Sequence, residues 1–233
     1  MYDKDSSGAG RPARATAPRT RTPGPAVRPA RPADADAAVA ILAQAFQDDA
    51  VTAWVFPGAD RRRALLPGFF RVVVDDLLTH GEIHLAGDVG VTLVAPPDAP
   101  DPTPARRRRH EERLRAATAE CADRAVAIGQ LLDEHHPRDR AHYHVVFNAV
   151  RPDWQGRGVS SAILRHVADR ADAAGAGCYV ECSSPGSLAL MVRHGFTPLP
   201  AVPLPGGPAL HPAWRDPAPG GRPAGRFPAK ADV

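Results

Sequence analysis

The residues best suited to hold an anion lie in one short segment, RPDWQGRGVSSAIL, which spans residues 151–164. The apolar run HYHVVFNAV before it indicates a buried strand, and the residues from about Gly158 have the pattern of a helix. Gln-Gly-Arg-Gly at 155–158 therefore lies where a helix begins and backbone N–H groups have no partner. Glycines let an anion approach the main chain, and Arg157 can add a charge-assisted bond. A phosphate or pyrophosphate is the expected ligand.

Two better-known phosphate loops are excluded by the same residues. No Lys-Ser or Lys-Thr pair follows the glycines, so the segment is not a P-loop. Its spacing also differs from the G-x-G-x-x-G pattern of dinucleotide-binding domains. A tight turn that uses glycine for its geometry alone remains the alternative interpretation.

The elements that must position this segment can be predicted from hydrophobic periodicity and from glycine and proline punctuation. We expect a short strand near Ala26, a helix capped by Asp34 or Asp36, and a helical region interrupted near Gly129. The whole set is strand 26–30, helix 35–46, helix 61–78, a hairpin of 82–87 and 89–97, helical region 106–136, strand 142–150, helix 158–174, strand 178–182, helix 187–194, strand 196–202 and strand 209–215. This order predicts an α/β protein with a mixed sheet and helices on both faces.

Composition divides the chain into three parts. Residues 1–24 and 217–233 are rich in Pro, Gly and Ala without apolar periodicity, and we expect both to be disordered around a domain of residues 25–216. Residues 1–31 form a basic arm that holds seven Lys or Arg residues and two Asp residues, so its net charge is +5. The whole chain has a net charge of +3, which leaves −2 for the residues after the arm. The remainder is then slightly acidic, and we interpret the arm as a solvated tail rather than a nucleic-acid site. In the arginine-rich opening of the region 106–136, Arg107 is expected to pair with Glu111 and Arg108 with Glu112 along a solvated helix face.

Three cysteines without a C-x-x-C pair indicate no disulfide framework. No apolar stretch has the length of a membrane span, and no apolar run follows the basic N-terminus. We therefore expect a cytoplasmic protein with no membrane partner.

The loop and its context resemble the acetyl-CoA loop of the GNAT superfamily of N-acetyltransferases. The family pattern is Gln or Arg, two residues, Gly, one residue, then Gly or Ala; here Gln155 and Gly158 match, and Ser160 takes the last position. The opening segment VRPARPADADAAVAILAQAFQDD and the Gly195-Phe196 pair are also typical of the family. The resemblance covers about residues 26–216 and is greatest to the puromycin acetyltransferase-like branch. It implies an acyl-CoA N-acyltransferase fold with a central, mostly antiparallel mixed sheet.

The resemblance also implies where acetyl-CoA binds. The molecule would lie in a V-shaped cleft between splayed strands 142–150 and 178–183, with the pantetheine arm on main-chain groups of Asn148 to Val150. The loop 155–161 would hold the pyrophosphate, and Ser187 stands where the family often has Asn. The expected set is Asn148, Ala149, Val150, Gln155, Gly156, Arg157, Gly158, Val159, Ser160, Ser161 and Ser187.

Proton transfer needs a base and an acid. Glu181 lies in an apolar strand, where burial would raise its pKa and suit it to act as a base; an ion-paired Glu is the alternative. Many family members protonate the departing thiolate with a tyrosine, but that position is Met191 here. Cys182, His194, Tyr143 or solvent would then supply the proton. We name Glu181 and Cys182 as the catalytic candidates.

The acceptor pocket is expected near residues 47–58. Asp48 and Asp49 could attract an ammonium group, and Trp54 and Phe56 could line the pocket; a solvated helix end and ordinary core are the alternatives. His142 and His144 alternate along one strand, but no third ligand is evident in the sequence, so no metal is expected.

The sequence thus predicts transfer of an acetyl group from acetyl-CoA to a primary amine on a small molecule, by a monomer or homodimer without a nucleic-acid partner. A catalytically quiet acyl-CoA-binding sensor is one alternative, which Met191 favours. Acetylation of a protein lysine or N-terminus is the other.

Overall fold

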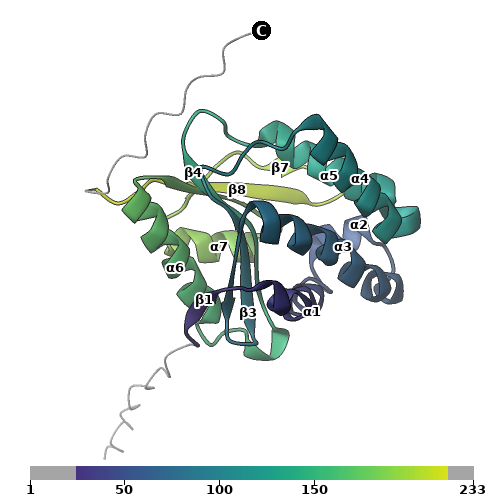
Figure 1. Ribbon diagram of the computed structural model, residues 1–233, viewed down its shortest axis with the longest axis horizontal. Coiled ribbons are helices and arrows are strands. Elements are labelled where there is room, and N and C mark those ends of the chain that lie inside the picture. The colour runs from purple at the N-terminus through teal and green to yellow at the C-terminus, as the bar shows by residue number, and fades with distance from the viewer. Residues whose placement is uncertain (1–24, 220–233) are drawn as a thin grey trace, which may run out of the picture.

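The computed structural model describes residues 25–219, so both predicted tails lie almost wholly outside the described residues. A single eight-stranded sheet runs through this part of the chain in the order β1-β2-β3-β4-β5-β8-β6, with β7 paired to β8. Only β4 and β5 are parallel, and every other pair is antiparallel. Helices cover both faces of the sheet (Figure 1). The predicted fold class is confirmed.

The first half of the chain builds one face. It contains β1 (Val27–Pro29), α1 (Ala35–Ala45), α2 (Ala50–Val55), α3 (Ala59–His80), β2 (Glu82–Ala86) and β3 (Gly90–Ala95). Leu42 of α1, Phe70 of α3 and Leu93 of β3 are fully buried in the core between them. Asp34, one of the two predicted caps of α1, is its N-cap residue, but its side chain makes no cap bond to that helix. Its carboxylate accepts bonds from the Arg28 guanidinium and the Arg31 backbone N–H instead.

The second core packs against the opposite face. It lies between β4 (His142–Val150), β5 (Gly177–Cys182), α6 (Val159–Ala174) and α7 (Pro185–Arg193). Val145, Leu164 and Val180 are among its buried members. The helical pattern of α6 ends at Gly175, which adopts the left-handed conformation with φ of 61°.

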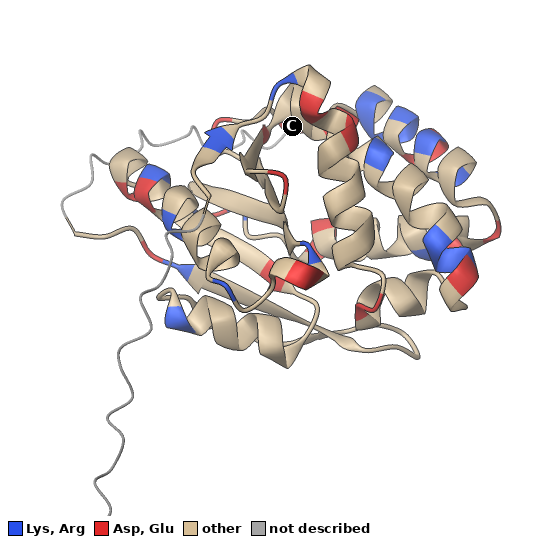
Figure 2. Cartoon of the chain, turned by 90° about the horizontal axis from the view of Figure 1, so that it is seen from below, with Lys and Arg blue, Asp and Glu red and all other residues tan. Residues whose placement is uncertain are grey.

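The helical region between β3 and β4 breaks earlier than predicted. Helix α4 (Pro104–Thr118) ends at Ala119, whose φ is 46°, and α5 (Ala122–His135) follows after one 3-10 turn, so Gly129 lies inside a helix. The arginines gather along α4 beside acidic residues (Figure 2). Arg106 pairs with Asp76 and Arg107 with Asp133, which are carboxylates of the two neighbouring helices rather than of α4 itself. The expected pairing of Arg107 within its own helix was therefore wrong, while the interpretation as an ion-paired face stands.

The C-terminal strands differ in one respect from the prediction. Strand β8 (Ala209–Arg215) has the predicted bounds and lies between β5 and β6. The predicted strand 196–202 is divided into β6 (Thr197–Pro198) and β7 (Val202–Pro203), because prolines have no N–H for a ladder. The backbone N–H of Ala218 donates to Asp172, so chain contacts with α6 continue past residue 216. No helix among the described residues is long and apolar enough to cross a membrane.

Candidate functional site: an acyl-CoA loop beside a parting strand pair

The two parallel strands part in the middle of the sheet. Pairing of β4 with β5 covers His142 to Val145 on one strand and Gly177 to Val180 on the other, although β4 continues to Val150. A bulge in the β3–β4 ladder at this level turns the chain of β4 away. Beyond Val145 the side of β4 that faces β5 therefore has no ladder partner there. This is the location that the sequence predicts for acetyl-CoA, with Asn148, Ala149 and Val150 along its edge.

The glycine loop connects the end of β4 to the start of α6. A 3-10 turn at Pro152–Trp154 comes first, and Gly156 and Gly158 then have φ values of 73° and 83°. A side chain at either position would be strained, which accounts for both glycines. Gly158 is the N-cap of α6 and no side chain caps the helix, so the first N–H groups of α6 remain available to an anion.

The remaining loop residues divide between support and contact. Gln155 donates its amide to the Val150 carbonyl at 3.3 Å, which fastens the loop to β4. The Arg157 guanidinium stacks over the Trp154 ring, 4.8 Å from its centroid, beside the helix start. Val159 is only 2% exposed and belongs to the core, so only its backbone N–H can serve a ligand.

A polar bridge joins the loop to β4. Asn148 Nδ2 donates to Ser160 Oγ at 2.9 Å, which gives the hydroxyl at the atypical motif position a structural partner. Asn148 Oδ1 is buried and has no hydrogen-bond partner. Such an atom is costly unless a ligand supplies the donor. Ser161 Oγ contacts His194 Nε2 at 2.9 Å and so links α6 to the end of α7.

Two further predicted residues, Ser187 at the start of α7 and Cys182 at the end of β5, are engaged locally or buried. Ser184 and Ser187 form a reciprocal capping box, so the Ser187 hydroxyl is engaged within its own helix. Cys182 and Met191 are 3% and 4% exposed in the core between α6, α7 and the sheet. Burial raises the pKa of the Cys182 thiol to about 11, which makes it a weaker proton donor than a free thiol.

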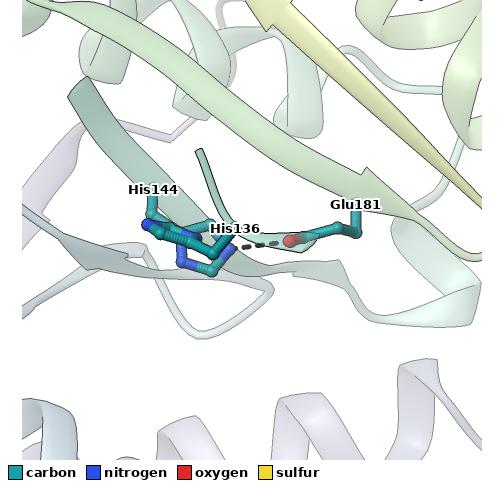
Figure 3. A group of neighbouring side chains, drawn as sticks. All are labelled: His136, His144 and Glu181. Atoms are coloured by element: carbon teal, nitrogen blue, oxygen red, sulfur yellow. Dashed lines mark hydrogen bonds and ion pairs between the residues drawn. The ribbon is translucent and has the colours of Figure 1, made fainter. Parts of the chain in front are cut away.

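The Glu181 side chain lies beside several histidine rings on the face of the sheet opposite to α6. Its Oε2 lies 2.8 Å from Nε2 of His144, and the ring of His136, which follows α5, stacks near the ring of His144 with centroids 4.8 Å apart (Figure 3). The Glu181 side chain is 7% exposed, and its Oε1 has no hydrogen-bond partner.

The pKa of Glu181 is shifted in the direction opposite to the one predicted from the sequence. Burial alone would raise it, but the adjacent imidazole of His144 holds the pKa below its usual value. The predicted raised pKa is thus wrong, and Glu181 is a carboxylate that hydrogen-bonds to His144. Burial lowers the pKa of His136 to about 4 and also lowers that of His142, so both rings are neutral at pH 7.

Sequence reasoning missed the residues that surround Glu181. His144 was visible as one half of a His-x-His strand pattern, and that alternation was the available signal. His136 lies outside any strand, and no sequence pattern pointed to it. The structure brings together a set that differs from the His142–His144 pair of the sequence: His136, His144 and Glu181 offer nitrogen and carboxylate atoms within 4.8 Å of one another.

The predicted acceptor residues are not brought together as an open pocket. Asp49 caps α2 through bonds from the N–H groups of Val51 and Thr52, and its other oxygen accepts from the Ser183 hydroxyl at the end of β5. Asp48 is exposed. Phe56 is 1% exposed and is core, since it packs against the aromatic side chains of α3.

Trp54 has a packing role as well. A Cβ atom on Gly207 would lie 2.5 Å from its ring, so the turn before β8 fits closely against it. Arg124 of α5 stacks over the same ring at 5.2 Å and donates to the Trp54 carbonyl at 2.6 Å. These contacts, together with the Asp49–Ser183 bond, fasten the segment 47–56 across the end of β5.

Comparison with known proteins agrees with this geometry. Residues 91–196 match the model of the acetyltransferase (GNAT) family. A solved structure described as histone acetyltransferase HPA2 and related acetyltransferase, from Corynebacterium glutamicum, is 29% identical with a TM-score of 0.64, and the match covers 84% of this chain and 97% of that one.

Two amine acetyltransferases share the fold at lower identity. The arylalkylamine N-acetyltransferase 2 of Aedes aegypti is 14% identical with a TM-score of 0.57, covering 82% of this chain and 98% of that one. The polyamine N-acetyltransferase of Drosophila melanogaster is 17% identical with a TM-score of 0.52, covering 82% and 99%. With the parting β4–β5 pair, these findings lead to one conclusion: residues 91–196 match the GNAT acetyltransferase family model, and the described residues have the fold of solved acetyltransferases.

Proposed function

We propose that this protein transfers the acetyl group of acetyl-CoA to a primary amine of a small molecule. The observation that carries the proposal is the uncapped start of α6, which two left-handed glycines place beside the point where β4 and β5 part. Helix N–H groups in that position suit a pyrophosphate, and an unpaired strand edge suits an extended amide arm.

Each part of the site has a defined task toward acetyl-CoA, which supplies the activated acetyl group. The N–H groups at the start of α6 and the Arg157 guanidinium would hold the pyrophosphate. The buried Oδ1 of Asn148 would accept an amide N–H of the pantetheine arm, which would supply its missing partner. The free edge of β4 beyond Val145 would donate to the thioester carbonyl as negative charge develops there.

In this scheme His144 accepts the proton of the attacking amine, and Glu181 positions the His144 ring. The amine nitrogen forms a bond to the carbonyl carbon, its proton passes to His144, and the carbon–sulfur bond then breaks to release the thiolate. The ionised Glu181 holds the ring by the 2.8 Å bond and stabilises the imidazolium. Because Cys182 is a weaker acid than a free thiol, solvent protonates the departing thiolate.

The acceptor side favours a small amine over a peptide. The segment 47–56 is held across the end of β5 by the Asp49–Ser183 bond, and Trp54 is held from α5 and from the turn before β8. A covering segment with three attachments leaves less of the sheet edge open than an extended polypeptide needs.

Calorimetric binding of acetyl-CoA tests the loop. Gly158→Glu puts a carboxylate and a strained backbone against the expected pyrophosphate, and we expect it to abolish binding. Gly129→Glu is the matched control, because it adds the same charge at an exposed helix position with open space around it. Equal affinity of the two variants would contradict the assignment of the loop.

A further inference from the structure

Three side chains from three separate elements converge on one point of the sheet. His136 follows α5, His144 lies on β4 and Glu181 on β5, and their ligand atoms all lie within 4.8 Å of one another (Figure 3). We propose that these three residues form a binding site for a zinc ion. Two imidazoles and one carboxylate with an open fourth position are a donor set that zinc prefers.

The hydrogen bonds around the cluster give His136 an outer partner. His142 Nδ1 lies 2.8 Å from the Arg140 carbonyl, which can only accept, so this nitrogen carries a hydrogen. His142 Nε2 in turn lies 3.1 Å from Nε2 of His136. An outer partner that orients the ring of a ligand is characteristic of metal-binding histidines.

Glu181 provides an independent sign of a missing ligand. Its Oε1 has no hydrogen-bond partner, and water does not replace one, because the side chain is only 7% exposed. A desolvated carboxylate oxygen with no donor is unfavourable, and a cation would supply what it lacks. The three groups come from three separate elements of the chain, so no continuous sequence motif joins them.

The cluster needs a modest adjustment and already has an access route. Zinc–ligand bonds of about 2.0–2.1 Å in tetrahedral geometry bring ligand atoms to roughly 3.4 Å from one another. The widest separation of 4.8 Å must therefore shorten. His136 can turn inward, because it lies beyond the end of a helix rather than within a strand. The rings of His136, His142 and His144 line a groove of about 1320 Å³ that is open to solvent.

A bound zinc ion would act as a reversible inhibitor. It would occupy the nitrogen and carboxylate that the transfer reaction needs for proton movement, so zinc and turnover compete for His144 and Glu181. This consequence rests on the proposed function, whereas zinc binding itself does not.

Titration of the metal-free, tag-free protein with zinc by calorimetry tests the site without any substrate. We expect one ion per chain, and we expect cobalt(II) at the same site to show the visible absorption of a tetrahedral complex. His136→Ala should weaken zinc binding by at least about tenfold. His135→Ala is the matched control, because this exposed neighbour bonds only to the Leu131 carbonyl, and it should leave the affinity unchanged.

Several results would overturn the site. These are no heat of binding at millimolar zinc, an undiminished affinity in His136→Ala, or an equal loss in His135→Ala. If circular dichroism shows that His136→Ala is unfolded, His136→Gln replaces it with the same expectation.

Inhibition is measured separately, by mass spectrometry of the acetylated product, since released CoA thiol also binds zinc. Loss of transfer with zinc and its recovery with chelator are expected. Full transfer by zinc-loaded protein would overturn the inhibitory role. If no amine is acetylated at all, the proposed function fails while the calorimetric titration still decides the metal site.

Discussion

Replacement of His144 by leucine should destabilise the protein more than replacement of His144 and Glu181 together. In the single variant the Glu181 carboxylate, which is 7% exposed, loses the His144 ring at 2.8 Å and stays buried. A buried charge left without its partner costs about 3–5 kcal/mol, whereas an apolar pair of similar volume is often neutral. For a domain of this size each kcal/mol lowers the Tm by about 2–4 °C, so the single variant should melt roughly 6–20 °C lower.

The assay is urea unfolding at pH 7 with chelator present, applied to the wild type, both single leucine variants and the double variant. We expect the double variant to be more stable than His144→Leu, which gives a large coupling free energy. Removal of the exposed pair Arg63–Asp60, with side chains 70% and 97% exposed, is the control and should leave the midpoint unchanged. Additivity of the His144 and Glu181 effects within about 0.5 kcal/mol would refute the coupling between these two side chains.

Two further predictions concern the loop and the acid stability of the fold. Gly156→Ala should lower the free energy of unfolding by about 1–2 kcal/mol, because the φ of 73° strains an alanine even though no atom lies within 4 Å of the new Cβ. Gly129→Ala within α5 should raise the free energy of unfolding by about 0.5–1 kcal/mol. The two variants should therefore shift the denaturant midpoint in opposite directions. Bonds from Arg215 hold the pKa of Asp172 below its usual range, so the unfolded state takes up this proton first as the pH falls. The stabilisation is complete above about pH 4 and is lost below it, and Asp172→Asn should flatten that acid limb of the stability curve; an unchanged limb would refute the assignment.

Local pattern was sufficient where an element is defined by its own residues. The apolar run of β4 and the glycines around Gly158 predict a strand, a loop and a helix start, and the structure contains all three. The bounds of β8 were likewise predicted from composition, although its place between β5 and β6 was not.

Local pattern failed where packing between distant elements decides. Ala119 breaks the helical region in a stretch of good helix formers, because Cys121 and Ala122 turn into the core there. In the sequence, Asp48 and Asp49 resemble a solvated pair of acids, but the hydroxyl of Ser183, far along the chain, donates a hydrogen bond to Asp49. The raised pKa expected for Glu181 assumed burial without a partner, and the imidazole of His144 supplies one.

Mass spectrometry of reaction products distinguishes acetyl transfer to small amines from transfer to peptides. Purified protein and acetyl-CoA are incubated with a library of small primary amines and lysine peptides, and products are followed by mass spectrometry. We expect a small amine made heavier by one acetyl group, with an equal amount of CoA released and no product in Gly158→Glu. Absence of both acetyl-CoA binding and product in the wild type, or peptide products without any small-amine product, would contradict it.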